Sequence, residues 1–247
     1  MSSTEAFFAS RSMQALEVLA FGPATASQVA AELQVHPRTA RRLLNRMVTD
    51  GWLSRRAGAR PTYAPTMRIV ALAAQLAQRA PLVRHATELA AELQARTGGA
   101  VHLAVPSYRS ALRLVRVAGD GERPPELRDL APANAIAAGK LLLAYREGWQ
   151  RAVLAAPLRE LTRHTLVDPE RLREQLAAVR ERGLAVEDEE FRVGVRAIAA
   201  PVRGEGEEVV AALALSAEAL PLPALLDHGE AVAAAAAQLT ARLAEAA

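Results

Sequence analysis

The sequence predicts an α+β protein with an N-terminal winged helix-turn-helix domain, a linker helix and a C-terminal α/β domain. Three observations support this fold class. Near the N-terminus, two short helical patterns flank a brief turn and are followed by a basic hairpin pattern. An alanine- and leucine-rich helical stretch comes next. Strand and helix patterns then alternate, which favours a mainly antiparallel sheet covered by helices.

The composition is that of an ordered protein with room for two modest domains. The chain has 247 residues, of which 51% are hydrophobic and 23% are charged. It contains no cysteine, which excludes disulfides, thiolate chemistry and cysteine-based metal sites. The N-terminus lacks the pattern of a signal peptide, and no apolar run is long enough for a membrane span. We therefore expect a cytoplasmic protein with no membrane partner.

The basic charge is concentrated in the first quarter of the chain. Residues 1–68 hold nine arginines against four acidic residues, a net charge of +5. Residues 69–247 hold 21 basic against 23 acidic residues, a net charge of −2. Such an asymmetry is typical of a protein whose basic end meets a polyanion.

Three helices are predicted before residue 52. The first carries Leu16 and Leu19 at helical spacing and stops at Gly22-Pro23. The second, in TASQVAAELQV, begins with Thr25 and Gln28 in the pattern of a capping box. A turn of about four residues then leads to the third helix, which is the spacing of a helix-turn-helix.

The third helix, in PRTARRLLNRMVTDGWL, has one apolar face and one arginine-rich face. Pro37 suits its first position and Gly51 suits the left-handed position after its end. Taken alone, such a face is more often a solvated surface. In the helix-turn-helix context it predicts DNA contacts from Arg38, Thr39, Arg41, Arg42, Asn45 and Arg46.

A basic hairpin is predicted directly after this helix. WLSRR and PTYAP flank a turn with glycine, and Arg55, Arg56 and Arg60 cluster near its tip. Three helices and a basic hairpin make a winged helix-turn-helix, in which these arginines would reach phosphate or the minor groove of double-stranded DNA.

The rest of the chain predicts a linker helix and a second domain. Residues 67–97 give two helical patterns separated by Pro81, and the first carries an apolar stripe that suits either a dimer seam or an internal core. A hairpin over 100–117, helices over 133–145 and 169–182, strands at 184–188, 195–203 and 208–216, and a final helix from 223 to about 245 follow. The predicted domains are 1–67, 68–80 and 81–247.

Catalytic, metal and cofactor signatures are absent from the sequence. No dinucleotide, phosphate-loop, zinc-protease or nucleophile-elbow motif occurs, and the five histidines share no metal-ligand spacing. The acidic run 187–190 could supply acid/base groups, but a solvated strand end explains it more simply. His102 on an alternating strand could contact a ligand or line the core. Lys140 is the only lysine of an arginine-rich chain, which suggests that this position needs an ammonium group.

Over nearly its full length the chain resembles the IclR family of bacterial transcriptional regulators. The similar segments are SMQALEVL, SQVAAELQV, RTARRLLNRMVTDGWL, TYAP, ANAIAAGKLLLAY, VRERGLAVEDEEFRVGVRAIAAPV and VVAALALS, and Lys140 falls in the family's Gly-Lys pair. The resemblance implies a DNA-binding N-terminal domain, a GAF-like C-terminal domain that binds a small effector, and dimers or tetramers on operator DNA.

The resemblance also implies an effector pocket formed by Ala137, Glu187, Ala197, Ala214 and Ser216. Family members often carry histidine at the position of Asn134, glycine at that of Ala137, cysteine at that of Ala197 and serine at that of Ala214. The pocket should therefore be less polar than is usual. With few converging cations, we expect an aromatic or short-chain carboxylic acid rather than a compact dianion, unless Arg113 or Arg116 reaches in.

Two other interpretations are weighed against an effector-responsive regulator. A nonspecific DNA-architectural protein would need no ligand pocket, and its binding would depend on salt but not on sequence. An enzyme with a DNA-binding appendage would need a nucleophile or an acid/base pair, and the sequence offers no clear one.

Overall fold

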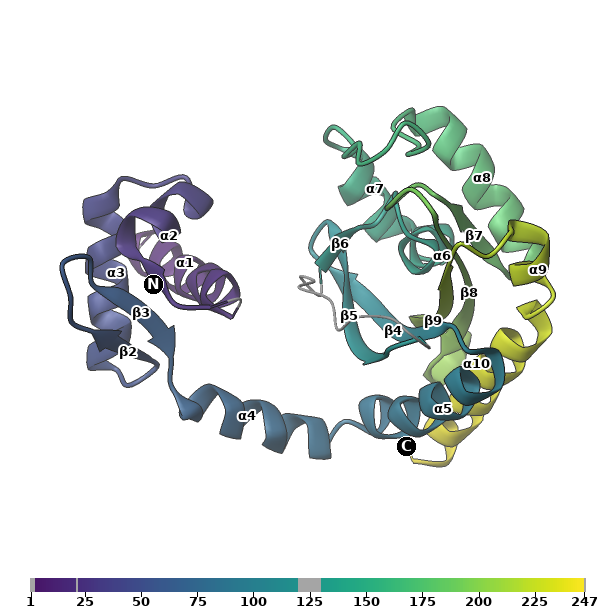
Figure 1. Ribbon diagram of the computed structural model, residues 1–247, viewed down its shortest axis with the longest axis horizontal. Helices are drawn as coiled ribbons and strands as arrows, with labels where there is room; N and C mark the ends of the chain where they lie inside the picture. Colours follow the sequence, from purple (N-terminus) through teal and green to yellow (C-terminus); the bar gives the residue numbers. More distant parts are fainter. Residues whose placement is uncertain (1–2, 21, 120–129, 247) are drawn as a thin grey trace. The chain divides into compact units, whose positions relative to one another are not determined.

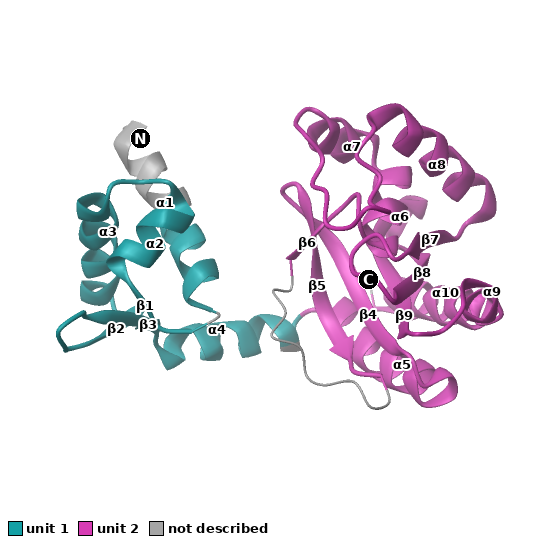
Figure 2. Cartoon of the chain, turned by 45° about the horizontal axis from the view of Figure 1, so that its top comes forward, with its two compact units in different colours: residues 1–79 teal, residues 80–247 magenta. Residues whose placement is uncertain are grey.

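The computed structural model describes residues 3–20, 22–119 and 130–246, and the chain forms two compact units, residues 1–79 and 80–247 (Figures 1 and 2). Each unit has its own hydrophobic core. No helix in the described ranges combines the length and the apolar character that crossing a bilayer requires.

Unit 1 is a winged helix-turn-helix with an additional helix at its end, as predicted. Leu44, Met47 and Tyr63 belong to a core that the three helices and the hairpin share. The three strands form an antiparallel sheet in the order β1-β3-β2. The elements are α1 Ser3–Leu19, β1 Ala24–Thr25, α2 Ala26–Leu33, α3 Pro37–Thr49, β2 Leu53–Arg56, β3 Thr62–Pro65 and α4 Met67–Gln78.

Local signals position the helices of unit 1. The capping box is present, since Thr25 accepts from the Gln28 amide and the Gln28 side chain accepts from the Thr25 amide. Pro37 begins α3, and Gly51 after its end has a φ of 78°. Helix α1 starts at Ser3, earlier than the apolar pattern from residue 13 indicated.

Unit 2 is built on a six-stranded antiparallel sheet in the order β6-β5-β4-β9-β8-β7. Helices α5 and α10 cover one face, and α6 and α8 cover the other (Figure 1). The elements are α5 Pro81–Thr97, β4 Ala100–Ser107, β5 Ser110–Val117, β6 Leu130–Pro132, α6 Ala137–Tyr145, α7 Glu147–Leu154, α8 Pro169–Arg182, β7 Ala185–Asp188, β8 Val195–Arg203, a 3₁₀ turn Glu205–Glu207, β9 Val209–Glu218, α9 Leu222–Leu226 and α10 Gly229–Glu245.

Two helix predictions in unit 2 were wrong at their boundaries. The pattern from residue 133 suggested one helix to 145, but α6 starts only at Ala137. The side-chain amide of Asn134 donates to the carbonyls of Arg159 and Leu166, 3.0 Å away in each case. These two bonds anchor the turn that precedes α6. The predicted final helix is split into α9 and α10 around Asp227 and His228. Helix α7 was not predicted.

The sheet register places the α6-facing side chains of unit 2 in rows. One row runs Glu187, Ala197, Ser216, Ala100 across β7, β8, β9 and β4. The next runs Ala185, Ala199, Ala214, His102, Arg116 and reaches β5. The centre of this face therefore carries mainly small side chains, which leaves room above the sheet.

Candidate functional site

A basic cleft lies in unit 1 between the start of α2, the helix α3 and the hairpin. It has a volume of about 780 Å³. Arg41 from α3, Arg55 from β2 and Arg60 from the hairpin turn line it together with Tyr63. Three predicted DNA contacts from three different elements thus share one cleft. Arg56 does not line it, and as the next residue after Arg55 it faces the other side of the strand.

Helix α3 presents the other predicted DNA contacts along its exposed side. Arg38, Arg42 and Asn45 are exposed and Thr39 is half-buried. The Asn45 side-chain oxygen accepts a 2.9 Å hydrogen bond from the Tyr63 hydroxyl, which leaves its amide NH₂ as the outward donor. Arg46 forms a 3.1 Å ion pair with Asp50 at the end of the helix. The structure therefore distinguishes Arg46, which has an acidic partner, from the arginines that line the cleft.

The start of α3 is capped by a histidine. Nδ1 of His36 accepts a 3.2 Å hydrogen bond from the Arg38 amide. This bond satisfies one of the amides that a helix leaves unpaired at its first turn. His36 thus has the structural role of capping the arginine-bearing helix.

Unit 2 contains a small inner hollow above the α6-facing side of its sheet. Its volume is about 70 Å³. Three of the five predicted effector residues, Glu187, Ala197 and Ser216, line it. The other two, Ala137 and Ala214, are buried in the adjoining core. The full lining is His102, Arg113, Arg116, Ile136, Glu187, Phe191, Arg192, Val195, Ala197 and Ser216.

Three arginines line this hollow, and two of them, Arg113 and Arg116, are the residues named as the exception to a site with few converging cations. Arg113 and Arg116 would point to opposite faces of a regular strand, since they are three residues apart. The pairing of β4 with β5 shifts between Leu103 and Ala104, so that Leu103 pairs with Val115 and Ala104 with Arg113. This irregularity turns both arginines to the α6-facing side.

The hollow contains two titratable groups that burial strongly affects. Burial raises the pKa of Glu187 to about 7, although the Phe191 amide and the charges of Lys140 and Arg113 favour its ionised form. Burial, together with the charges of Arg113 and Arg116, holds the pKa of His102 well below its ordinary value. His102 is therefore a neutral polar group at physiological pH.

The only lysine of the chain, Lys140 on α6, forms a buried ion pair close to this region. Nζ of Lys140 is 2.5 Å from Oε1 of Glu190, and the Lys140 side chain is fully buried. Burial lowers the pKa of Lys140, whereas the charge of Glu190 and its hydrogen bond act in the opposite direction. The pair ties α6 to the segment between β7 and β8, which carries Phe191 and Arg192 into the hollow.

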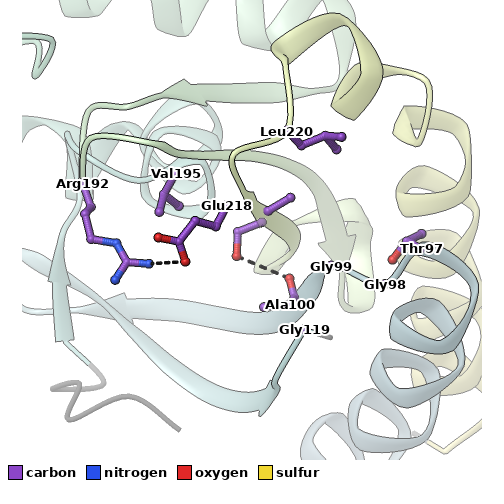
Figure 3. Close-up of a pocket in the computed structure, with 11 residues that line it drawn as sticks. Thr97, Gly98, Gly99, Ala100, Gly119, Arg192, Val195, Glu218 and Leu220 are labelled. Atoms are coloured by element: carbon purple, nitrogen blue, oxygen red, sulfur yellow. Dashed lines mark hydrogen bonds and ion pairs between the residues drawn. The ribbon is translucent and has the colours of Figure 1, made fainter. Parts of the chain in front are cut away.

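A larger outer hollow of about 310 Å³ adjoins the inner one (Figure 3). The two share Arg192, Val195 and Ser216. Arg192 forms a 3.5 Å ion pair with Glu218 across it. The Ser216 hydroxyl donates to the Ala100 carbonyl at 3.4 Å. A ligand larger than the inner hollow could therefore extend outward past Arg192.

The sequence prediction missed several lining residues. Phe191 and Arg192 follow the acidic run, which was interpreted as a solvated strand end. His102 does face the site, which was one of its two expected roles. The alternation of β4 could have indicated His102, but no local signal identifies Arg192. Among the described residues, no group of three or more His, Asp or Glu side chains has the arrangement of a metal site.

A winged helix-turn-helix with a basic cleft, followed by an α/β unit with a polar hollow, defines the class of ligand-responsive transcriptional regulators. Comparison with known proteins narrows this class. The model of the bacterial transcriptional regulator IclR C-terminal family matches residues 74–241. The chain therefore belongs to the IclR family of bacterial transcriptional regulators.

Individual relatives agree with this assignment. The chain is 30% identical over 213 residues, 83% of each protein, to the probable transcriptional regulator SauR of Cupriavidus necator. An IclR homolog from Microbacterium hydrocarbonoxydans, crystallised with 4-hydroxybenzoate, is 26% identical with a TM-score of 0.76, over 96% of this chain and 99% of that one. The IclR regulator of Alicyclobacillus acidocaldarius shares the fold, with a TM-score of 0.81 at 23% identity over 98% and 99% of the two chains.

Proposed function

We propose that this regulator binds operator DNA through unit 1 and that a small carboxylic acid in the hollow of unit 2 changes its affinity for that DNA. The observation that carries the proposal is the convergence of Arg113, Arg116 and Arg192 on one hollow in a chain whose other unit has an arginine-lined cleft. Guanidinium groups bind carboxylates and phosphates in the same bidentate way.

The DNA contacts follow from the two faces of unit 1. Arg38, Arg42 and Asn45 lie on the exposed side of α3 and would reach base edges in the major groove. Arg41, Arg55 and Arg60 line the cleft beside it and would hold the phosphate backbone. The predicted contacts of Thr39, Arg46 and Arg56 belong to the same interface, and we expect the smallest effect from Arg46 because Asp50 already pairs with it.

Fluorescence anisotropy with DNA from upstream of the protein's own gene, against random competitor, tests this half. We expect a preference for that DNA of roughly 10³-fold or more at physiological salt. Arg42→Ala should weaken operator binding without changing the circular dichroism spectrum. Arg151→Ala, which removes an exposed arginine of unit 2, is the matched control and should bind like the original chain. Equal operator binding by Arg42→Ala would remove Arg42 from the interface.

The effector is proposed to be an aromatic or short-chain carboxylic acid. Arg113 and Arg116 both line the hollow and would pair with a carboxylate, although these arginines were also the stated exception under which a compact dianion could be held. The IclR homolog with 4-hydroxybenzoate, an aromatic acid, supports this class of ligand. Ala197 gives the lining a small apolar side chain, which suits a hydrocarbon body, and Ala137 and Ala214 are buried in the core beside it.

Isothermal titration calorimetry with a panel of aromatic and short-chain acids tests the effector half. We expect monocarboxylates to bind, and Arg113→Met to weaken their binding by about tenfold or more, as loss of a charge-assisted hydrogen bond implies. Arg173→Met, on the exposed surface of α8, is the control. Binding of compact dianions alone would reject this ligand class.

We further propose that the chain self-associates through α4, as a dimer or as a tetramer built from dimers. Four large apolar side chains on this helix are exposed: Met67 by 76%, Val70 by 55%, Leu72 by 43% and Leu76 by 61%. Leu72 and Leu76 lie one turn apart on the same side of α4 and form an exposed apolar stripe, which is typical of an association surface. Light scattering should show a smaller assembly for Leu72→Glu/Leu76→Glu than for Gln75→Glu, and an equal mass for both would reject the proposal.

The proposal assigns no reaction to the chain. Its named relatives are transcriptional regulators, and ligand binding accounts for the residues that line the hollow. A protein that acts on operator DNA would work in the bacterial cytoplasm.

A further inference from the structure

We propose that Asn45 on α3 reads guanine in the operator, and that the buried hydroxyl of Tyr63 sets this preference by holding the asparagine oxygen away from the DNA. An asparagine that is free to offer both its oxygen and its NH₂ group typically reads adenine. The inference rests on the proposed function, because it assumes that α3 enters the major groove, and it adds the base that one side chain selects.

Tyr63 is held firmly in the fold of unit 1. It lies on β3, the central strand of the three-stranded sheet, where it pairs with Ala24 of β1 and with Arg55 of β2. The residue is only 2% exposed and belongs to the core that the helices and the hairpin share. Close packing therefore fixes the position of the ring, and its hydroxyl reaches α3 from the sheet.

The hydroxyl of Tyr63 needs an acceptor, and Asn45 supplies it. The O–H group donates to Oδ1 of Asn45 at 2.9 Å, and within the described part of the chain it makes no other hydrogen bond. If the amide were turned the other way, the NH₂ group would face the hydroxyl, and the hydroxyl proton of an almost fully buried residue would have no acceptor. Because a buried donor without an acceptor is costly, this bond sets the orientation of the amide.

This orientation leaves Asn45 with donors for the DNA. Arg38, Arg42 and Asn45 are exposed, and their spacing of three and four residues places them on the same side of α3. Nδ2 of Asn45 makes no hydrogen bond to any described residue. The two N–H bonds of the amide are therefore available to a base edge, whereas Oδ1 is directed back towards the sheet.

Among the four bases, guanine best matches a side chain that offers only donors. Its major-groove edge carries two neighbouring acceptors, N7 and O6. Adenine carries one acceptor beside an amino group, and that amino group would find no oxygen of Asn45 to receive its proton. Cytosine presents a donor, and thymine presents one acceptor beside its methyl group. The arrangement therefore favours guanine over adenine at the base pair that Asn45 contacts.

The test is selection of DNA by the full chain from a pool of random duplexes, followed by fluorescence anisotropy with single-base variants of the selected sequence. Asn45→Ala identifies the base pair that Asn45 contacts, because sequence preference should be lost at that pair alone. There we expect the original chain to bind guanine about fivefold or more tightly than adenine, which is the lower end of the discrimination that one good base contact gives.

Tyr63→Phe is the decisive variant, because it removes the hydroxyl and keeps the ring in the core. Asn45 can then turn its oxygen outward and bind adenine through both of its polar atoms, so the preference for guanine should disappear or pass to adenine. Preference at the other base pairs should not change, whereas a general loss of structure would weaken binding to every sequence. Tyr145→Phe, which removes a hydroxyl from unit 2, is the matched control and should bind like the original chain.

A second variant does not depend on the stability of Tyr63→Phe. Asn45→Asp keeps an acceptor for the Tyr63 hydroxyl but offers the DNA only oxygens. Its preference at the same base pair should therefore move from guanine to cytosine, whose amino group is a donor. Thermal unfolding of both variants checks that unit 1 is folded in each.

The outcomes separate this inference from the proposed function. Adenine bound more tightly than guanine by the original chain at the Asn45 base pair would overturn the inference and leave the DNA-binding regulator in place. So would an unchanged preference for guanine in folded Tyr63→Phe, or an Asn45→Ala variant that keeps its preference at every base pair. If the random pool yields no enriched sequence, sequence-specific binding itself is rejected, and the inference falls with it.

Discussion

At the scale of single residues, the buried charge of Lys140 is balanced by the carboxylate of Glu190. Its ammonium is fully buried 2.5 Å from Glu190 Oε1, so removing the lysine leaves a buried carboxylate without its cation. We expect Lys140→Met to lower the free energy of unfolding of unit 2 by about 3–5 kcal/mol. Urea unfolding in a Trp52→Phe background, in which Trp149 is the remaining tryptophan, measures this loss.

A double variant separates the charge effect from lost packing. Lys140→Met/Glu190→Leu removes both charges and should recover much of the stability, because no charge is left buried without its partner. The ion pair would not be needed for the fold if the single variant unfolded at the same urea concentration as the original chain.

Glu187 makes the stability of unit 2 depend on pH. Its pKa is raised from 4.5 to about 7, so between these values the folded chain holds a proton that the unfolded chain releases. Stability should therefore fall as the pH rises from about 4.5 to about 7. Glu187→Gln lacks this dependence, and at pH 8 it should be more stable than the original chain by on the order of 3 kcal/mol.

Urea unfolding of both proteins at pH 5 and pH 8 measures this difference. The two unfolding curves should lie close together at pH 5 and separate at pH 8, with the variant the more stable. A difference that is the same at both pH values would mean that Glu187 does not titrate in this range.

At the scale of elements, the start of α3 depends on an unusual cap. Because His36 Nδ1 accepts from the Arg38 amide, His36→Ala should cost about 1 kcal/mol of unit 1 stability. His36→Asn restores a strong capping side chain and should keep most of that stability. Thermal unfolding in a Trp149→Phe background, where Trp52 reports on unit 1, measures both. Equal losses in the two variants would point to a role for the imidazole other than capping.

Regular elements could be predicted from the sequence, whereas their irregularities could not. The capping box at Thr25 and the helix 169–182 with Asp168 before it and Gly183 after it carry local signals, and both are confirmed. The shift in register at Leu103 carries none, because it depends on how two strands pair. That shift turns Arg113 and Arg116 to the same side, so the sequence could name both as candidates but could not show that both line the hollow.

At the scale of the whole molecule, the order of patterned segments was sufficient to predict the fold class. Helix-turn-helix spacing, a basic hairpin and a later α/β pattern led to the IclR family, which the family match over residues 74–241 confirms. The effector residues were transferred by motif, and Ala137 and Ala214 lie in the core beside the lining rather than in it. Arg192 and Phe191 were missed because their segment reaches the hollow only through the tertiary structure.

The proposed regulation predicts a reciprocal change in two affinities. If an acid in unit 2 changes operator affinity by some factor, operator DNA must change the affinity for the acid by the same factor. A coupling free energy of about 1–3 kcal/mol corresponds to roughly 5–150-fold. Operator binding measured with and without saturating acid, and acid binding measured with and without operator, give the four constants of this cycle. Because DNA contacts and acid contacts belong to different units, Arg42→Ala should weaken operator binding while leaving the affinity of the DNA-free chain for the acid unchanged. Two unequal factors would mean that a further process, such as a change of oligomeric state, accompanies one of the binding steps; two factors of one would mean that the acid does not regulate DNA binding.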